Sequence, residues 1–373
     1  MIIKLKRDEF SKALSKIKLG LGNLRIFPVT SAIRLFRNDN KFTIVSTDMD
    51  TFIEVSIDAE FSDSGDLDII VAADQITKLV DKTTVDFISI HVEEDLVKIR
   101  GNGTYKIPLL DLTYPVYNDN PGECVVYMIP LSEIQDALKV SKCSVGSSSL
   151  MPFLSGYYVG SNKVVTTDGT KMCIVYKHLV DEPILLSQKV VDLIGNFSSS
   201  EYINDNGEII LSKYESHILV SGNNVNIYTS ELADKDKYPD ISSIINLEYS
   251  GECKLVASDL IDSLNRISIF VDPFENVGVY MLFDESGLFM RDFKGHSSEF
   301  IECDIKGELG FKVFVNPKFL LDLLNVVKSS ELTIKYGNEN AVQIESDGVI
   351  QIVSQMEYEG DDAIEFKKSG EVN

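Results

Sequence analysis

The chain has 373 residues, a 44% hydrophobic fraction and a formal net charge of −23 at pH 7. This length and apolar content allow two or three domains with buried cores, and they exclude a largely disordered chain. The sequence starts without a charged-then-apolar leader and has no apolar run near the ~20 residues of a membrane span, so we expect a cytoplasmic protein with no membrane partner.

The five cysteines are scattered along the chain, and none forms a C-x-x-C pair: Cys124, Cys143, Cys173, Cys253 and Cys303. An odd number at such spacings argues against a disulfide framework and against a zinc site. We therefore predict small buried apolar residues at these positions, and neither a metal nor a cofactor.

The acidic excess argues against a protein that bulk charge holds on nucleic acid, because phosphate binding depends on clustered Lys and Arg. If the protein acts on DNA, its attachment must come from shape. Basic residues would then gather on one face, and acidic residues would face away from it.

A long internal period of roughly 120 to 125 residues divides the chain into three. Each third opens with a short apolar strand that leads into an amphipathic helix. These helices share an apolar-x-x-[Ala/Ser]-Leu pattern, at Phe10 to Leu14, Ile134 to Leu138 and Leu260 to Leu264. The i, i+3, i+4 spacing puts the apolar positions on one helical face, which must be buried.

A strand, a polar turn and a second strand recur in each third, over 41–57, 163–177 and 287–305. Alternating β-branched and polar residues around Asp, Gly and Ser predict hairpins there. A second amphipathic helix follows each hairpin, at Ile76 to Val80, Val190 to Ile194 and Leu320 to Leu324.

Each third ends in a three-strand meander, over 87–109, 208–230 and 331–355, with tight-turn residues at the tips. The sequence thus predicts an α+β fold of three repeated domains, each with two helices packed on one side of antiparallel sheet. Polar, turn-forming residues place the domains at 1–121, 122–249 and 250–358, and we expect 359–373 to be a flexible C-terminal tail.

The six predicted helices, approximately 7–19, 72–82, 130–142, 186–197, 258–269 and 315–328, hold about 12 Lys and Arg against about 10 carboxylates. They are near neutral or slightly basic, whereas the rest of the chain carries the negative excess. If the helices face one way and the strands the other, the protein has a basic lining and an acidic exterior.

Three segments resemble the bacterial β subunit of DNA polymerase III, the sliding clamp family. Thr167-Asp168-Gly169-Thr170-Lys171-Met172 is similar to the family's T-D-G-H-R-L, Lys237-Tyr238-Pro239-Asp240 is similar to its R-F-P-D, and 316–328 resembles its last inner helix. The resemblance extends to about Glu357. It implies three similar clamp domains, a head-to-tail homodimeric ring, and a non-enzymatic processivity factor that encircles duplex DNA without reading its sequence.

In such a ring, helices cross the phosphate backbone through weak, salt-sensitive contacts. The resemblance makes a set of basic residues candidates for the DNA-facing lining: Lys12, Lys16, Arg25, Lys78, Lys82, Lys139, Lys142, Lys189, Arg266 and Lys318. For each residue alone, an ordinary solvated charge is the competing interpretation. The family's basic residue in the first-domain loop is displaced here to Arg25.

The resemblance also implies a hydrophobic cleft that takes short linear peptides from the replicative polymerase and the clamp loader. Carried over by position, its walls are Leu154, Thr167, Gly169, Thr170, Lys171, Met172, Pro239, Ser243, Ile244, Asn316, Phe319, Ile352, Ser354, Gln355 and Met356. Apolar anchors in a preformed groove are a sensible basis for such recognition, although the apolar members could equally be core. Thr170, Lys171 and the Ser354-Gln355-Met356 segment depart from the family pattern and predict a more polar cleft.

Ring closure requires complementary edges, and the matching positions are apolar: Tyr105, Ile107, Ile269 and Phe270. Apolar residues at an exposed strand edge are otherwise an aggregation hazard, so we predict a dimer. In the tail, Asp361 to Phe366 loosely resembles a clamp-binding peptide, and we hypothesise that it competes for the cleft.

The alternatives to a clamp are an enzyme and a repeat-built peptide-binding scaffold that does not encircle DNA. The four histidines are far apart and show no metal-binding spacing, and no phosphate-binding glycine loop occurs. Asp48 and Asp50 could hold Mg²⁺ in a nuclease, but a turn aspartate pair more often caps the turn. The sequence leaves open which polymerase or loader the protein serves, and whether its gene is chromosomal, plasmid or phage.

Overall fold

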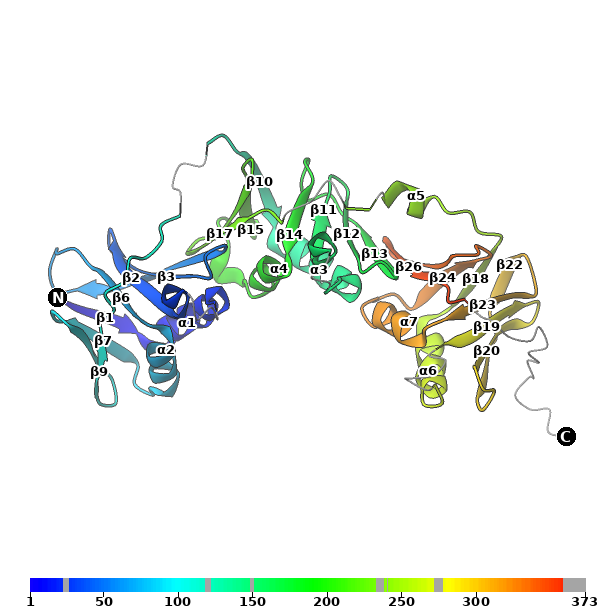
Figure 1. Cartoon of the computed structure of the whole chain (residues 1–373), viewed down its shortest axis with the longest axis horizontal. Helices are drawn as coiled ribbons and strands as arrows, with labels where there is room; N and C mark the ends of the chain where they lie inside the picture. The colour runs from blue at the N-terminus through cyan, green and yellow to red at the C-terminus, as the bar shows by residue number, and fades with distance from the viewer. Residues whose placement is uncertain are drawn as a thin grey trace. The chain divides into compact units, whose positions relative to one another are not determined.

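The computed structural model describes residues 1–22, 27–117, 122–147, 151–232, 238–239, 241–271 and 278–357. They form helices and antiparallel strands that fall into two compact units (Figure 1). Unit 1 comprises Met1–Gln135 and Lys189–Glu231, and unit 2 comprises Asp136–Gln188 and Leu232–Asn373. Arg25, Lys237, Asp240 and the tail from 358 onward lie outside the described residues.

The repeated helices form where the periodicity predicts them. The helices are α1 (Arg7–Gly20), α2 (Ala73–Lys82), α3 (Leu131–Ser141), α4 (Gln188–Gly195), α6 (Ala257–Ser268) and α7 (Pro317–Leu324). A further short helix, α5 (Ile241–Ile245), was not predicted. Each third of the chain thus carries the expected helix pair, which confirms the α+β fold class.

Unit 1 holds a five-stranded and an eight-stranded sheet. The first has the order β5 (Glu60–Phe61), β1 (Ile2–Lys6), β7 (Phe87–Val92), β8 (Leu96–Arg100), β9 (Thr104–Pro108). The second has the order β10 (Val125–Pro130), β15 (Glu208–Lys213), β16 (His217–Ser221), β17 (Val225–Ser230), β4 (Phe52–Asp58), β3 (Lys41–Thr47), β2 (Ala32–Asn38), β6 (Asp68–Ala72).

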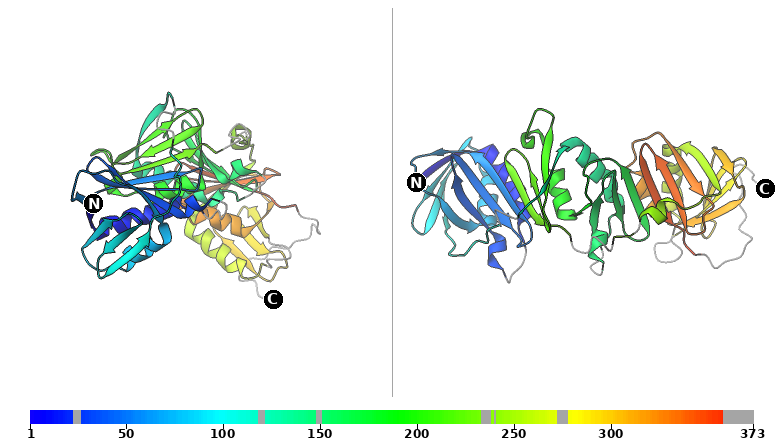
Figure 2. Two further views of the ribbon diagram at one scale, coloured as in Figure 1. Left: turned by 60° about the vertical axis from the view of Figure 1, so that its left-hand side comes forward. Right: turned by 90° about the horizontal axis from the view of Figure 1, so that it is seen from above.

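Helix α1 shows how the sequence fixes these elements. Phe10, Leu14 and Ile17 lie on one face and are fully buried, and the helix packs on β3, β4 and α2 (Figure 2). The negative charge of Asp8 in its first turn and the positive charge of Lys18 in its last turn interact favourably with the helix dipole. The Ser46 hydroxyl donates a 2.7 Å hydrogen bond to the Ile17 carbonyl, so the end of α1 is tied to β3.

Unit 2 holds a nine-stranded and a four-stranded sheet. The first has the order β14 (Ile184–Ser187), β11 (Gly156–Val159), β12 (Lys163–Thr167), β13 (Lys171–Tyr176), β26 (Val349–Ser354), β25 (Ala341–Ser346), β24 (Glu331–Tyr336), β18 (Gly251–Val256), β22 (Asp304–Gly307). The second has the order β21 (Ser298–Ile301), β20 (Gly287–Asp292), β19 (Val279–Asp284), β23 (Phe311–Val315).

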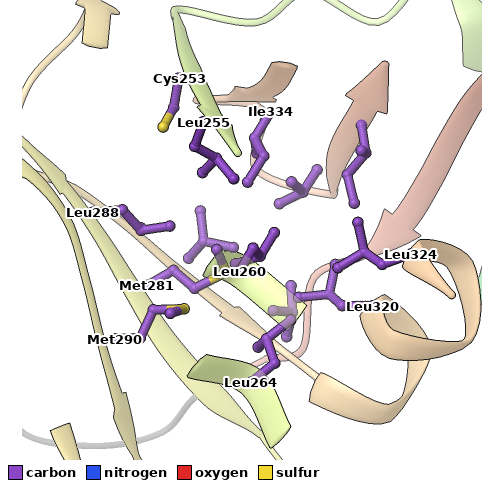
Figure 3. Close-up of a cluster of buried hydrophobic side chains, with 14 of the residues drawn as sticks. Cys253, Leu255, Leu260, Leu264, Met281, Leu288, Met290, Leu320, Leu324 and Ile334 are labelled. Carbon is purple, nitrogen blue, oxygen red and sulfur yellow. The ribbon is translucent and has the colours of Figure 1, made fainter. Parts of the chain in front are cut away.

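A large apolar core of unit 2 lies among these two sheets and helices α6 and α7. Figure 3 shows Leu260 and Leu264 from α6 and Leu320 and Leu324 from α7 pointing toward the side chains of the strands. All four leucines are 0–1% exposed. The apolar faces that the sequence marked on the two helices are therefore core faces, as predicted.

Both large sheets join strands from different thirds of the sequence. In unit 1, β17 pairs with β4, with Val225 opposite Val55. In unit 2, β13 pairs with β26, with Met172 opposite Ile352. The strands of the second third are thus divided between the two units, which nothing in the local sequence pattern predicted.

Candidate functional site

The polar turn between β12 and β13 is built by its own side chains. One carboxylate oxygen of Asp168 accepts hydrogen bonds from the backbone N–H groups of Thr170 and Lys171, both at 2.9 Å, and from the Thr170 hydroxyl at 2.7 Å. Gly169 has φ +91°, which favours glycine because it has no Cβ. This tight turn leaves Gly169 and Thr170 exposed at the end of the hairpin.

Beside this turn lies a buried apolar group that we call the cleft cluster, after the cleft that the resemblance predicts there: Val165, Met172, Ile174, Leu185, Tyr238, Ile241, Ala341 and Ile352. It draws on β12, β13, β14, α5, β25 and β26, and it is separate from the large core. Ile244, on α5, is partly buried against it. Strand pairing brings Met172 and Ile352 together, and their exposed fractions are 4% and 5%.

An ion pair links the turn to helix α7. The Lys171 ammonium lies 2.7 Å from the Asp322 carboxylate and 5.4 Å from the centre of the Phe319 ring. The Lys171 side chain is only 10% exposed. At the start of α7, the Asn316 side chain accepts a 2.9 Å hydrogen bond from the Lys318 backbone N–H, which caps the helix. Neither contact of Lys171 was predicted.

The remaining predicted cleft residues also lie in unit 2. Leu154 is buried, Thr167 is 3% exposed, and Pro239, Gln355 and Met356 are half-buried, whereas Ser243 and Ser354 are exposed. The Ser354 N–H donates to the Thr170 carbonyl at 2.9 Å, and the Met356 N–H donates to the Phe314 carbonyl at 2.8 Å. These bonds attach the last residue of β26 to the turn and the chain after β26 to β23.

Two residues at this site were missed by the sequence reasoning. Tyr238 is buried in the cleft cluster, stacks on Tyr158 with ring centres 5.2 Å apart, and donates to the Val165 carbonyl at 3.0 Å. Asp322 is the ion-pair partner of Lys171. The only sequence signal for Asp322 is its position three residues after Phe319, on the same helical face.

The predicted DNA-facing residues that the structure describes lie on helices or, for Lys142, in a short 3₁₀ helix. Four form ion pairs inside the chain: Lys16 with Glu201, Lys78 with Asp74, Lys189 with Asp48, and Arg266 with Glu299. Lys12, Lys82, Lys139 and Lys318 are exposed and form no ion pair with a described residue. The last four are therefore the candidates for contact with an anionic ligand.

The predicted dimer residues behave differently from one another. Tyr105 is 41% exposed, Ile269 is 78% exposed and Phe270 is 49% exposed. Ile107 lies on the same face of β9 as Tyr105, two residues away, but its side chain is only 4% exposed. β9 is the edge strand of the five-stranded sheet, as expected, but the expectation of an exposed apolar side chain is wrong for Ile107.

Asp48, one of the two carboxylates considered for Mg²⁺, caps the turn that holds it. Asp48 accepts hydrogen bonds from the backbone N–H groups of Asp50 and Thr51, at 3.1 and 2.8 Å, and pairs with Lys189. Within the described ranges, no group of three or more His, Cys, Asp or Glu side chains is arranged to hold a metal ion. In the same ranges, no helix has the length and apolar composition required to cross a membrane.

Comparisons with known proteins agree on one family. Residues 1–118 match the family model for the N-terminal domain of the DNA polymerase III beta subunit. The beta sliding clamp of Rickettsia bellii is 23% identical over 332 residues, which cover 83% of this chain and 86% of that protein.

Solved structures share the fold. The DNA polymerase sliding clamp of Bacillus subtilis superposes with a TM-score of 0.84 at 18% identity, covering 96% of this chain and 100% of that one. A Pseudomonas aeruginosa sliding clamp bound to griselimycin gives the same TM-score at 16% identity, with the same coverage. Residues 1–118 thus match the N-terminal domain of the DNA polymerase III beta subunit, and the chain as a whole is similar in sequence to a beta sliding clamp and shares the fold of solved sliding clamps.

Proposed function

We propose that the protein is a DNA sliding clamp, a processivity factor that encircles duplex DNA and tethers the replicative polymerase. The observation that carries the proposal is a threefold repeat of helix pair and sheet whose fold matches a whole bacterial clamp chain. In this proposal the repeats are domains 1–121, 122–249 and 250–358, and two copies join head to tail.

Primer extension tests this function. Added to the replicative polymerase and clamp loader of its own cell, the protein should lengthen the products made in a single binding event. Products of unchanged length would contradict the proposal. Because a clamp performs no chemistry, we also propose that the protein is not an enzyme. A clamp acts where DNA is replicated, so we propose that it acts in the cytoplasm.

We propose that exposed helix lysines make the contacts with DNA. An anionic protein on an anionic polymer needs a local basic surface, and Lys12, Lys82, Lys139 and Lys318 are not neutralised by a described carboxylate. Such contacts reach phosphates and not bases, so the ring would slide.

The Lys82→Ala/Lys318→Ala variant should bind duplex DNA more weakly and with a lower salt dependence. Each phosphate contact contributes about 0.9 to the slope of log K against log salt, so the slope should fall by about 2 per subunit. Fluorescence anisotropy with a labelled duplex over a salt series measures it. The control is Lys41→Ala/Lys254→Ala, which removes the same charge from exposed strand positions. Equal slopes for the two variants would contradict this assignment.

We propose that the cleft cluster and its polar rim take the partner peptides. Apolar side chains at the floor and half-buried ones at the edge suit a short peptide with apolar anchors. The exposed backbone and hydroxyl groups of Gly169, Thr170 and Ser354 would fix its direction. The Lys171–Asp322 pair adds a charged wall, so we expect a partner peptide with polar residues beside its anchors.

The Ile244→Ser/Met356→Ala variant should bind a partner peptide about 10-fold or more weakly, because it removes apolar area from the cleft edge. Both side chains are half-buried, and the backbone hydrogen bond of Met356 is retained. The measurement is anisotropy of a labelled peptide that carries the clamp-binding segment of a bacterial replicative polymerase. Leu309→Ala is the control, since Leu309 is an exposed apolar residue of unit 2 outside the cleft. Wild-type affinity in the cleft variant would rule out this site.

The second candidate function is a peptide-binding scaffold that never encloses DNA, and it would use the same cleft. It predicts normal peptide binding together with no effect on polymerase products.

In either case, the C-terminal tail is proposed to compete for the cleft. Deletion after Glu359 should then tighten peptide binding.

A further inference from the structure

Two cysteines of unit 2 lie in direct contact. The Cys253 thiol is a hydrogen-bond donor to Cys303, and the two sulfur atoms are 3.1 Å apart. Cys253 lies in β18 and is 0% exposed, whereas Cys303 lies in the short link between β21 and β22 and is half-buried. The sequence predicted only small buried apolar residues at both positions, and 50 residues separate them along the chain.

The contact bridges the two sheets of unit 2. β18 belongs to the nine-stranded sheet, and the Cys303 link leaves the four-stranded sheet at β21 to enter the nine-stranded sheet at β22. β22 is the edge strand of that sheet, and among the described strands it pairs with β18 alone, with Cys253 opposite Ile305. Figure 3 shows the Cys253 sulfur at the margin of the large core, near Leu255.

The two thiols differ in acidity and in access. The hydrogen bond from Cys253 lowers the pKa of Cys303; burial opposes this shift, and a backbone hydrogen bond with Leu288 supports it. The same thiol contact and burial raise the pKa of Cys253. Cys303 therefore ionises first, and it is also the thiol that a small solute can reach.

We propose that Cys253 and Cys303 form an oxidisable dithiol site whose substrate is a hydroperoxide. The Cys303 thiolate attacks the outer oxygen of the hydroperoxide, which breaks the O–O bond and leaves a sulfenic acid on Cys303. The departing alkoxide, or hydroxide from hydrogen peroxide, takes up the proton that Cys303 released on ionising and leaves as an alcohol or as water. The Cys253 sulfur then attacks the sulfenic sulfur. A disulfide forms, the S–O bond breaks, and the departing hydroxide takes the Cys253 proton and leaves as water.

The net reaction converts two thiols and one hydroperoxide into one disulfide, one alcohol and one water. Closing the sulfur distance from 3.1 Å to the about 2.05 Å of a disulfide requires a movement of only about 1 Å. The disulfide would join the link before the edge strand β22, which holds Cys303, to strand β18. It would thereby fasten the two sheets that enclose the large core of unit 2.

The test is a mild hydrogen peroxide treatment of the full chain, followed by alkylation of remaining thiols, non-reducing digestion and mass spectrometry. The expected product is a peptide pair joined through Cys253 and Cys303 that separates on reduction. The oxidised protein should also melt several degrees above the reduced one, because a cross-link restricts the unfolded chain. Cys303→Ser should lose both effects, and Cys124→Ser, which removes an exposed cysteine of unit 1, should retain both.

The cross-link is read on the wild-type protein, so its detection does not depend on whether any variant folds. Cys303 oxidised to a sulfinic acid beside an unmodified Cys253 would overturn the proposal. So would a disulfide that joins only Cys143 to Cys173, or only cross-links between chains through Cys124.

Discussion

Replacing Phe270 with aspartate is expected to convert the protein from a dimer into a monomer. Phe270 and Ile269 follow helix α6, and their side chains are 49% and 78% exposed in the single chain. Large apolar side chains that water surrounds are covered most simply by a partner surface. In the proposed dimer that surface includes Tyr105 of the other subunit. A carboxylate buried there without a partner costs several kcal/mol, so the dissociation constant should rise by about 100-fold or more.

Light scattering at micromolar concentration measures this change. The matched control is Leu309→Asp, because Leu309 has the same 49% exposed fraction and also lies in unit 2. That variant should remain dimeric. A monomeric wild-type protein at low salt, or a dimeric Phe270→Asp variant, would remove the basis for the proposed interface.

Glu201→Ala is expected to lower the free energy of unfolding by about 3–5 kcal/mol, because it leaves a partly buried ammonium without its partner. Glu201 is 0% exposed and pairs with Lys16, whose side chain is 16% exposed. Its carboxylate also accepts bonds from the Ser198 N–H at 2.6 Å and the Ser200 hydroxyl at 2.7 Å. Urea denaturation monitored by circular dichroism gives the value. Glu215→Ala, an exposed position in unit 1, should change it by less than about 0.5 kcal/mol.

The same site predicts a pH dependence. Burial raises the pKa of Glu201, but the hydrogen bonds from Lys16, Ser200 and Ser198 outweigh burial and hold that pKa below its ordinary 4.5. The folded state then favours the charged carboxylate. The contribution to stability is therefore fully present above pH 4.5 and is lost as the pH falls through the folded pKa. Glu201→Gln should lack this acid-side component, and an unchanged pH profile in that variant would contradict the assignment.

The sequence predicted the local elements well, for a physical reason. The helical periodicity of Phe10, Leu14 and Ile17 records a buried face, and that face depends only on residues close together in the chain. The pairing of β17 with β4 and of β13 with β26 depends on edges that meet in space. No local pattern encodes that choice, so the division of the strands of the second third between two compact units was not predicted.

At the candidate site, too, some features were predicted from the sequence and others depend on long-range contacts that were not. The resemblance placed Thr167 to Met172 beside Ile352, and the strand register brings Met172 and Ile352 together. Charge patterns were less informative, because the sequence does not show which lysines are neutralised. Lys16 and Lys189 were predicted to face DNA, yet each pairs with a carboxylate far away in sequence. Ile107 was expected to be exposed on an edge strand, and it does lie on the edge strand β9, but its side chain is buried.

The most direct test of a sliding clamp is its retention on DNA of different topology. Labelled protein is placed by a clamp loader on nicked circular duplex, washed in high salt, and followed before and after a restriction enzyme linearises the circle. A ring is held by its closure and not by charge, so we expect retention on the circle in salt that abolishes phosphate contacts, and rapid loss after linearisation. Equal release from circular and linear DNA, or retention that survives cutting, would contradict the account.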